Sequence, residues 1–597
     1  MKDMFGKLRT AFASSKEEDR VAEDGTTVQQ TTEAGKVDHD AELQKPDDVE
    51  GALVDETAQH GVQTVEATTL VWTRATLATV FVLMWFIYLT NGFQSSVTWT
   101  LQPYAVSEWE SHSLIPVISV VASSMNAAVF IPLSKILDLW GRAEGFLLMV
   151  LIATLGMALM AGSHNLPTYC AAYVFWQVGW SGLIYSIDVI TADTTRLKNR
   201  GLAYAFTSSA YMVTAFAGPK AAEGFLYHVN WRWGFGCFCI VLPVVAAPLY
   251  LMFSWNLRKA RKTGILTKES SGRTFMQKIK WGLIEFDAAG AFLFAAGLVI
   301  FLLPFSIATT APNGWKTGYI IAMIILGFFL LVAFGLFERY IAPKPFLAHG
   351  FLTDRTIIGV CLLDLVYQIS YYCWSSYFTS FLQVVNDLDP SQATWISNTF
   401  DIISGVLLFL VGYSIRRTGH FKWLLNVGVP MFMLFQGLMI HFRQPGQSIG
   451  YLIMCEVFIS IAGAAFILCM QVGILAAVDH QHVATALAVL SVTGSAGGAI
   501  GSTVSGSIWT NTFHTRLVAL LPSDAMENID MIYGDLETQL SYPMGSPTRI
   551  AIQQAYGYAQ ARMLGAGTGI MAIAILSLFL IKNYDLRKLK QTKGMVF

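Results

Sequence analysis

Apolar stretches of about twenty residues recur along the chain from residue 75 onward, and short polar connections separate them. Twenty residues of α-helix span about 30 Å, the thickness of the hydrocarbon core of a bilayer. The pattern therefore predicts fourteen transmembrane helices. Their predicted bounds are 75–97, 114–134, 144–163, 168–190, 200–222, 233–254, 285–306, 318–338, 355–376, 394–414, 422–441, 449–471, 485–508 and 561–581.

The composition fits a protein whose surface faces lipid. Apolar residues make up 54% of the chain and charged residues 13%, about half the share of roughly 25% in soluble proteins. So few charges cannot cover several soluble domains, and we predict an all-α membrane protein. The net charge of −1 provides no positive field for nucleic acid, so no such partner is expected.

The basic residues predict an orientation. If the N-terminus lies in the cytosol, most of the 39 Lys and Arg residues fall in cytosolic connections or tails. This is the bias that the positive-inside rule describes. We therefore expect a multi-pass protein with both termini in the cytosol.

Six regions follow from this arrangement. They are an acidic, disordered cytosolic tail (1–74), a six-helix N-terminal bundle (75–254), a cytosolic linker with two extra helices (255–338), the first five helices of the C-terminal bundle (339–508), a long extracellular loop (509–560), and the last helix with a cytosolic tail (561–597). The long loop is rich in aromatic residues and is expected to pack partly over the outer entrance. In it, Tyr556 is a candidate for guiding substrate; the alternative is that the rings anchor the loop at the membrane interface.

Two short motifs point to gating. Asp138, Gly141 and Arg142 lie between two predicted helices, and their spacing resembles the loop signature of the major facilitator superfamily, in which such charges hold the inner gate closed. Gly218 and Pro219 look like the kink motif of proton-coupled antiporters in that superfamily, although the double glycine that usually completes it is absent.

Further stretches are similar to the fungal siderophore–iron transporter family. They are Asn91–Ser96, Lys135–Arg142, Asp193–Gly201, Ala215–Ala222, Asn230–Phe235 and Trp374–Phe378. The resemblance implies a major facilitator fold with fourteen transmembrane helices and proton-driven uptake of ferric siderophores. Asn91 and Ser375 stand where many relatives carry an acid, so the resemblance does not identify the proton-coupling residue.

Acidic side chains inside the predicted helices are candidates for proton coupling. An ionisable group at bilayer depth costs roughly 2.5–3.5 kcal/mol on insertion scales, so it needs a reason to be there. The candidates are Asp364, Asp188, Asp401 and Glu456. The alternative for each of them is a carboxylate fixed by hydrogen bonds in helix packing.

Polar and aromatic side chains on helix faces are candidates for binding substrate. Asp364, Tyr367, Gln368, Tyr371 and Ser375 follow i, i+3, i+4, i+7, i+11 spacing, so they share one face that is too polar for lipid. A ferric hydroxamate presents an amide-rich apolar shell, which aromatic walls with a few hydrogen-bond donors suit. The full candidate set is Asn91, Gln94, Gln177, Tyr367, Gln368, Tyr371, Trp374, Tyr377 and Tyr556.

The sequence contains no apparatus for catalysis. A P-loop and a G-x-S-x-G nucleophile motif are both absent, and none of the seven cysteines has zinc-ligand spacing with histidines. We therefore expect a secondary active transporter rather than an enzyme, with no cofactor and no metal site. A siderophore would itself fill the coordination sphere of the iron it carries.

The leading functional prediction is proton-coupled uptake of ferric, hydroxamate-type siderophores across the plasma membrane, with endosomal vesicles as a second location. The expected partners are the ferric siderophore, protons and the lipid bilayer, and the protein is expected to be a monomer. One alternative is a drug or peptide proton antiporter with fourteen helices, which Gly218 and Pro219 favour. The other is a receptor or sensor that does not transport.

Overall fold

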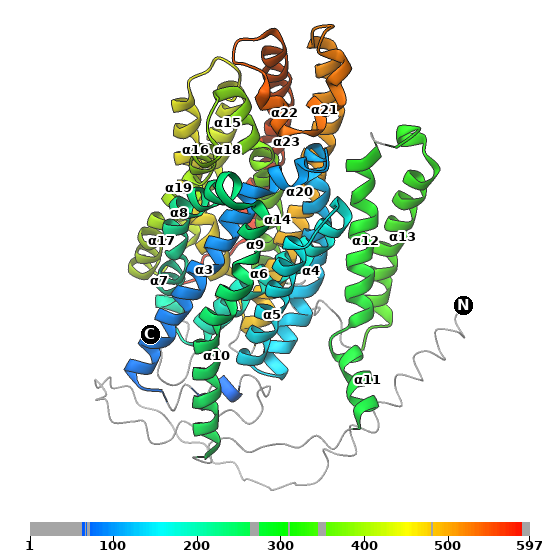
Figure 1. Cartoon of the computed structure of the whole chain (residues 1–597). Helices are drawn as coiled ribbons and strands as arrows, with labels where there is room; N and C mark the ends of the chain where they lie inside the picture. The colour runs from blue at the N-terminus through cyan, green and yellow to red at the C-terminus, as the bar shows by residue number, and fades with distance from the viewer. Residues whose placement is uncertain are drawn as a thin grey trace, which may run out of the picture.

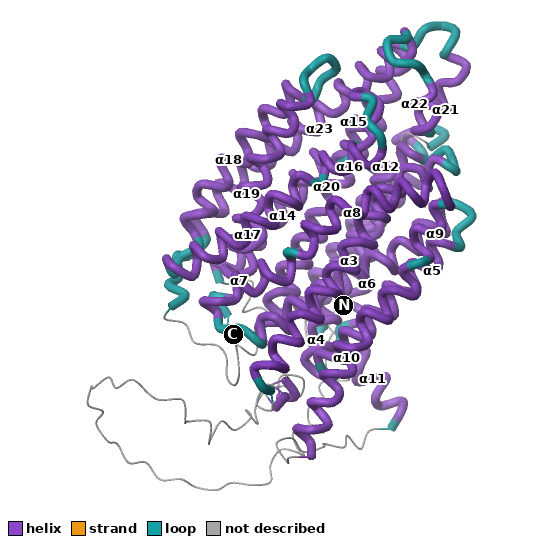
Figure 2. The backbone as a smooth tube through the Cα atoms, turned by 60° about the vertical axis from the view of Figure 1, so that its left-hand side comes forward, coloured by secondary structure: helices purple, strands orange, loops and turns teal. Residues whose placement is uncertain are grey.

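The computed structural model describes residues 72–262, 274–308, 311–343, 354–478 and 482–587, with the short stretches 63–65 and 67–68. These residues are helical or in loops and turns, and none of them forms a strand (Figure 2). The longer helices are α3 (Arg74–Ser107), α4 (Ile115–Leu139), α5 (Arg142–Ala161), α6 (Leu166–Asp193), α7 (Leu197–Ser208), α8 (Ala210–Gly224), α10 (Phe238–Lys262), α12 (Ala288–Ile307), α13 (Gly318–Tyr340), α14 (Arg355–Ser375), α17 (Thr399–Thr418), α18 (Lys422–Phe442), α19 (Ile449–Leu475), α20 (Val483–Leu520) and α23 (Pro547–Leu580). Shorter ones are η1 (His112–Leu114), α9 (Trp231–Gly236), α11 (Phe275–Glu285), α15 (Phe378–Asn386), α16 (Pro390–Ser397), η6 (Met526–Asn528), α21 (Ile529–Gly534) and α22 (Leu536–Ser541).

Helical segments occupy all fourteen predicted positions. Within the described ranges, twelve segments are long and apolar enough to cross a membrane. The other two positions hold α6 and the broken pair α7–α8. They lie inside the bundle, α6 against α5 and α4, and α8 against α3. The prediction of an all-α membrane protein is confirmed.

The helices form two halves and a separate hairpin (Figure 1). Helices α3–α10 make the N-terminal half and α14–α23 the C-terminal half; α4 packs on α20, and α7 and α8 pack on α17. The hairpin of α12 and α13 stands at the edge, where α12 contacts both α4 and α20. We call the end of the bundle where α3 begins and α23 ends the inner end, because the sequence predicts both termini in the cytosol.

Local sequence explains where several helices begin. Gly141 has a φ of +133°, a region that favours glycine, and α5 starts at the next residue. Asp354 is the N-cap of α14: its carboxylate accepts hydrogen bonds from the backbone N–H groups of Thr356 (2.7 Å) and Ile357 (3.3 Å). Lys582, just after α23, lies 3.3 Å from the same carboxylate. This contact joins the inner ends of two helices of the C-terminal half.

The predicted outer loop is shorter than 509–560. Helix α20 runs on to Leu520 and α23 begins at Pro547, so the predicted helix ends at 508 and 561 lie inside helices. Polar residues such as Asn511 interrupt the apolar pattern there, but Phe513 and Leu517 are buried against protein, which allows the helix to continue. The connection that remains contains η6, α21 and α22.

Part of the predicted disordered tail is ordered. Residues 63–65 and 67–68 are helical, and Ala67 is buried against Ala260 at the inner end of α10. The ring of Trp72 lies 5.8 Å from that of Phe253. The prediction of disorder is therefore wrong for these residues, because their apolar side chains find a helix to pack on. The remainder of the prediction, over 1–62, 66 and 69–71, lies outside the described residues.

Candidate functional site

A cavity of about 220 Å³ lies between the two halves. Asp188 and Asp401, both predicted as proton carriers, line it from opposite halves. The other lining residues are Tyr88, Ile184, Tyr204, Ser208 and Tyr211 of the N-terminal half, and Ser404, Gly405, Leu408, Ile467, Leu468 and Gln471 of the C-terminal half. The cavity therefore combines two carboxylates, three phenols and an amide.

Asp188 connects the two halves. Its side chain accepts a hydrogen bond of 2.7 Å from the Tyr88 hydroxyl on α3 and one of 3.1 Å from the Gln471 amide on α19. The Tyr204 hydroxyl donates to the backbone oxygen of Asp188 at 3.2 Å. An ionised carboxylate accepts both side-chain bonds, whereas a protonated one carries an O–H donor. A proton on this carboxylate would therefore turn one of the two accepting oxygens into a hydroxyl, beside the hydrogen bond that links the halves.

Asp401 lies in the same cavity, on α17, and is half-buried. The two acids differ in their surroundings. The carboxylate of Asp188 accepts from two side-chain donors, whereas that of Asp401 has no hydrogen bond among the described residues; the Ser404 hydroxyl donates to the Asp401 backbone oxygen, at 3.4 Å. Asp401 is thus the less constrained of the two carboxylates.

The polar face predicted on α14 divides between two neighbours. Asp364 packs at Gly494 of α20, where an added Cβ would lie 2.6 Å from a carboxylate oxygen, and Gln368 packs at Gly497. These glycines make room for the polar side chains. Asp364 is buried between the two helices of one half rather than placed with Asp188.

The tyrosines of that face turn into the C-terminal half. The ring of Tyr367 lies 5.6 Å from Phe432 and 5.2 Å from Phe466, and Tyr371 lies 5.9 Å from Phe400. They belong to the aromatic core of the C-terminal half.

The amides predicted in the N-terminal half bind one another. Asn91 accepts a 2.6 Å hydrogen bond from Gln94 and donates one of 3.4 Å to the backbone oxygen of Trp180 on α6. Both side chains are buried, while Gln177 on α6 is half-buried. Asn91 and Gln94 thus join α3 to α6.

Aromatic residues close the outer end. Tyr377 stacks on Trp509 with ring centroids 4.0 Å apart, and its hydroxyl donates to the backbone oxygen of Ser113 in the other half at 2.7 Å. Tyr556 is fully buried, 5.0 Å from the ring of Trp509, and donates to Gln539 at 2.8 Å. Both predicted residues therefore sit in a packed layer. Tyr556 is thus covered by protein, and it neither lines the cavity nor is exposed at a membrane interface.

The remaining outer candidates, Glu456 and Trp374, are buried inside the C-terminal half, together with Arg443, which was not predicted as a site residue. Glu456 and Arg443 are fully buried and interact electrostatically. Arg443 donates to the backbone oxygen of Trp374 at 2.6 Å. Trp374 is itself buried in the core, so its indole is packed rather than presented to the cavity.

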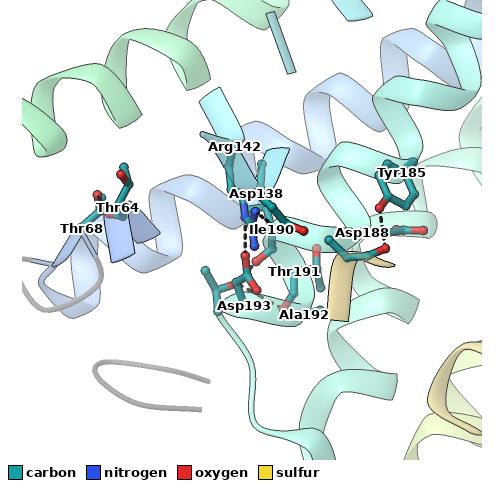
Figure 3. A network of polar contacts seen from close by, with 12 residues as sticks. Thr64, Thr68, Asp138, Arg142, Tyr185, Asp188, Ile190, Thr191, Ala192 and Asp193 are labelled. Atoms are coloured by element: carbon teal, nitrogen blue, oxygen red, sulfur yellow. Dashed lines mark hydrogen bonds and ion pairs between the residues drawn. The ribbon is translucent and has the colours of Figure 1, made fainter. Parts of the chain in front are cut away.

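Asp138 and Arg142, predicted as gating residues, form a buried triad with Asp193 at the inner end (Figure 3). Arg142 lies 2.6 Å from Asp138 of α4 and 2.9 Å from Asp193 at the end of α6. Asp193 was not predicted as a site residue, although it begins one of the stretches quoted above. The triad joins the ends of three helices in one half, and Asp138 also interacts electrostatically with His482 beside the start of α20.

Gly218 and Pro219 lie in α8, which continues past them to Gly224; the break between α7 and α8 is at Ser209. A Cβ at Gly218 would lie 2.4 Å from the Ser96 hydroxyl, so this glycine allows α8 to approach α3 closely. In the described part of the chain, no three His, Cys, Asp or Glu side chains are grouped for a metal ion.

Comparison with known proteins places this geometry in context. The model of the Major Facilitator Superfamily matches residues 84–363. The siderophore iron transporter mirB of Emericella nidulans is 56% identical over 92% of this chain and 91% of its own length. The MFS siderochrome iron transporter 1 of Gibberella zeae is 52% identical over 94% and 93%. Among solved structures, a bacterial homolog of the human lysosomal transporter Spinster aligns with a TM-score of 0.52 at 15% identity, over 85% of this chain and 97% of that one; this likeness concerns the fold.

Proposed function

We propose that this chain, which belongs to the siderophore iron transporters of the major facilitator superfamily, carries ferric siderophores inward across the plasma membrane, driven by protons. The observation that carries the proposal is the position of Asp188. It is a buried carboxylate that accepts hydrogen bonds from both halves beside the cavity between them. In such folds the halves rock about a central site, so a proton at this position acts on the contact that has to change.

The proton step concerns Asp188 and its two donors. While Asp188 is ionised, the Gln471 amide donates a hydrogen bond to its carboxylate, and the inner side of the cavity is closed. A proton on the carboxylate takes away one accepted hydrogen bond, so the N-terminal and C-terminal halves separate more easily there. Loss of the proton on the cytosolic side restores the bond and resets the carrier.

The conformation described here is closed at both ends. Tyr377 joins the halves at the outer end, and Tyr185 donates to the backbone oxygen of Ala484 at 2.6 Å at the inner end. Sites for drug-sized ligands have volumes of about 300–1,000 Å³, so a cavity of about 220 Å³ must widen to hold a siderophore. Once it widens, its phenols and amide offer donors to the hydroxamate and amide oxygens of the cargo.

Uptake of iron-55 as ferric hydroxamate, in cells without their own siderophore transporters, tests the proposal. Wild-type uptake is expected to rise as external pH falls and to stop when a protonophore is added. Asp188→Asn should reduce uptake about tenfold or more and remove its pH dependence, with unchanged surface abundance.

Asp364→Asn is the matched control, because Asp364 is also a buried acid but lies away from the cavity. It should retain the pH dependence. The reverse result, with pH dependence lost only in Asp364→Asn, would make Asp364 the proton carrier. Uptake that changes neither with external pH nor on addition of the protonophore would refute proton coupling altogether.

A further inference from the structure

Two tryptophans extend the cavity face of the N-terminal half toward the outer end. Tyr88 of α3 and Ile184 of α6 line the cavity. Trp99 follows Tyr88 by eleven residues, which is close to three helical turns, so the two side chains share one face of α3 about 16 Å apart. Trp180 lies one turn before Ile184, on the outer side of it. The ring centroids of Trp99 and Trp180 are 5.5 Å apart, edge to face, so α3 and α6 meet through these two indoles.

The contacts of α3 with other helices show that Trp99 points inward. A Cβ at Gly218 of α8 would meet Ser96, and one at Gly234 of α9 would meet Leu101, so neighbouring helices cover these two sides of α3. Trp99 lies on the side that faces the cavity. Although it points inward, Trp99 is 42% exposed. Its ring therefore has unfilled space beside it even while both ends of the carrier are closed.

Packing explains other large rings of α6 but does not explain the exposure of Trp99. Trp176 is fully buried, and its ring centroid lies 6.0 Å from that of Trp180. Phe175 is 44% exposed, but it precedes Ile184 by nine residues and so lies on the opposite side of α6, away from the cavity. An exposed ring on the outside of a membrane protein contacts lipid, whereas one on an inward face is available to a ligand.

Polar groups accompany the two indoles. Gln177 was predicted to bind substrate and lies half-buried on the same face of α6, seven residues before Ile184. Among the described residues, the hydrogen bond at Gln177 goes to its backbone oxygen, from the Ser181 hydroxyl at 2.6 Å, so its amide is available to a ligand. The indole N–H of Trp180 is covered and has no acceptor there. Flat apolar surface beside such donors suits a cargo with flat apolar groups next to amide oxygens.

We propose that Trp99 and Trp180 select among siderophores by packing against the acyl groups of their hydroxamates, which rests on the proposed uptake of ferric hydroxamates. When the halves separate, the indole faces contact the acyl groups, and Gln177 donates to an amide oxygen of the cargo. A large, flat acyl group covers more of the indoles than a methyl group does. The pair therefore favours hydroxamates with aromatic acyl groups over acetylated ones.

Equilibrium binding to purified, full-length protein in detergent tests this selection. The probes are two iron-55 trihydroxamates with the same peptide backbone, one carrying acetyl and the other benzoyl groups. Wild-type protein should bind the benzoyl compound about two- to tenfold more tightly, the range that one aromatic contact contributes. Trp99→Ala should remove most of this preference by weakening the binding of the benzoyl compound. Trp99→Phe, which keeps a flat ring, should retain the preference.

Phe175→Ala is the matched control, because it removes a ring of similar exposure from the opposite side of α6. It should leave both affinities unchanged. Trp99→Leu provides a second measurement if Trp99→Ala fails to fold, since it keeps apolar bulk and loses only the ring. A preference in Trp99→Leu equal to that of wild type overturns the proposal. An equal loss of affinity for the two compounds also overturns it, because that result would show a structural role.

The binding assay requires neither protons nor transport, so it separates this proposal from the proposed function. Wild-type protein that binds neither compound would contradict the proposed cargo, and the selection with it. Wild-type protein that binds both compounds, with a preference that persists in Trp99→Ala and Trp99→Leu, would contradict selection by these rings alone.

Discussion

The triad at the inner end allows a quantitative test of what its charges do for stability. Arg142 is buried together with Asp138 and Asp193, and both carboxylates bond the same guanidinium, at 2.6 and 2.9 Å. Arg142→Gln leaves two buried carboxylates facing each other without a cation. Removal of one partner from a buried ion pair costs about 3–5 kcal/mol, which corresponds to more than a hundredfold in an equilibrium constant.

The two aspartates are expected to behave differently from the arginine. Asp193→Asn keeps an oxygen that accepts from Arg142 and leaves the arginine paired with Asp138, so the remaining group is neutral. The loss is then the difference between a charged and a neutral hydrogen bond, about 1 kcal/mol. The same reasoning applies to Asp138→Asn. We therefore predict that Arg142→Gln lowers stability far more than either aspartate variant does.

This order of stability loss can be measured on detergent-solubilised, full-length protein. The protein is heated, and the fraction that stays monodisperse gives a midpoint for each variant. Lys220→Gln is the matched control, because Lys220 pairs with Glu223 but its side chain is 63% exposed, and exposed pairs contribute about 0–1 kcal/mol. Midpoints for Arg142→Gln that match those of Lys220→Gln would refute the reasoning. So would equal losses for Arg142→Gln and Asp193→Asn, since two buried carboxylates left without a cation would then cost no more than a neutral remaining pair.

Three further outcomes follow from individual contacts. Burial raises the pKa of Asp354, but the two backbone N–H groups it caps and the Lys582 ammonium outweigh burial and hold that pKa below its ordinary value. Asp354→Ala should therefore lower the stability at pH 7 by about 1 kcal/mol, seen as a lower melting midpoint. The difference from wild type should begin to shrink as pH falls below about 4 and be lost only below the lowered pKa of Asp354. Gly218→Ala should reduce surface abundance because its Cβ meets the Ser96 hydroxyl at 2.4 Å, and Ser96→Gly should restore abundance in the double variant. Tyr556→Phe leaves the buried amide oxygen of Gln539 without its donor, which should cost about 1–3 kcal/mol of stability and lower the surface abundance of the protein. The ratio of uptake rates for two siderophores should stay unchanged. A changed ratio would show that Tyr556 contacts the substrate.

The helices were predictable because the period of the apolar pattern and the thickness of a bilayer constrain them locally. The intramembrane acids were predictable for a similar reason, since an ionisable residue in an apolar run is visible without knowledge of its neighbours. The hydrogen-bond partners of Asp188 were not predictable from the sequence. Gln471 is 283 residues away and Tyr88 is 100 residues away, and neither stands out in its own helix. Nothing in the sequence around Tyr88 distinguishes it from an aromatic residue that only packs against a neighbouring helix.

The polar face of α14 shows where helical spacing stops being sufficient. Residues at i, i+3, i+4 and i+7 cover an arc broad enough to contact two neighbours at once. Asp364 and Gln368 lie on the side toward α20, and Tyr367 and Tyr371 on the side toward the core of the C-terminal half. Which part of the arc meets which neighbour depends on how the helix is rotated in the bundle, and a single helix does not determine that.

The contacts that close the two ends of the carrier differ in chemistry, and this difference bears on coupling. At the outer end the Tyr377 hydroxyl donates to a backbone oxygen, and Tyr104 binds an amide, so these bonds contain no ionisable group at physiological pH. At the cavity, Asp188 is itself the acceptor from Gln471. Under the proposed proton coupling, a proton on Asp188 would act directly on that contact, whereas neither outer hydrogen bond contains a group that titrates near neutral pH.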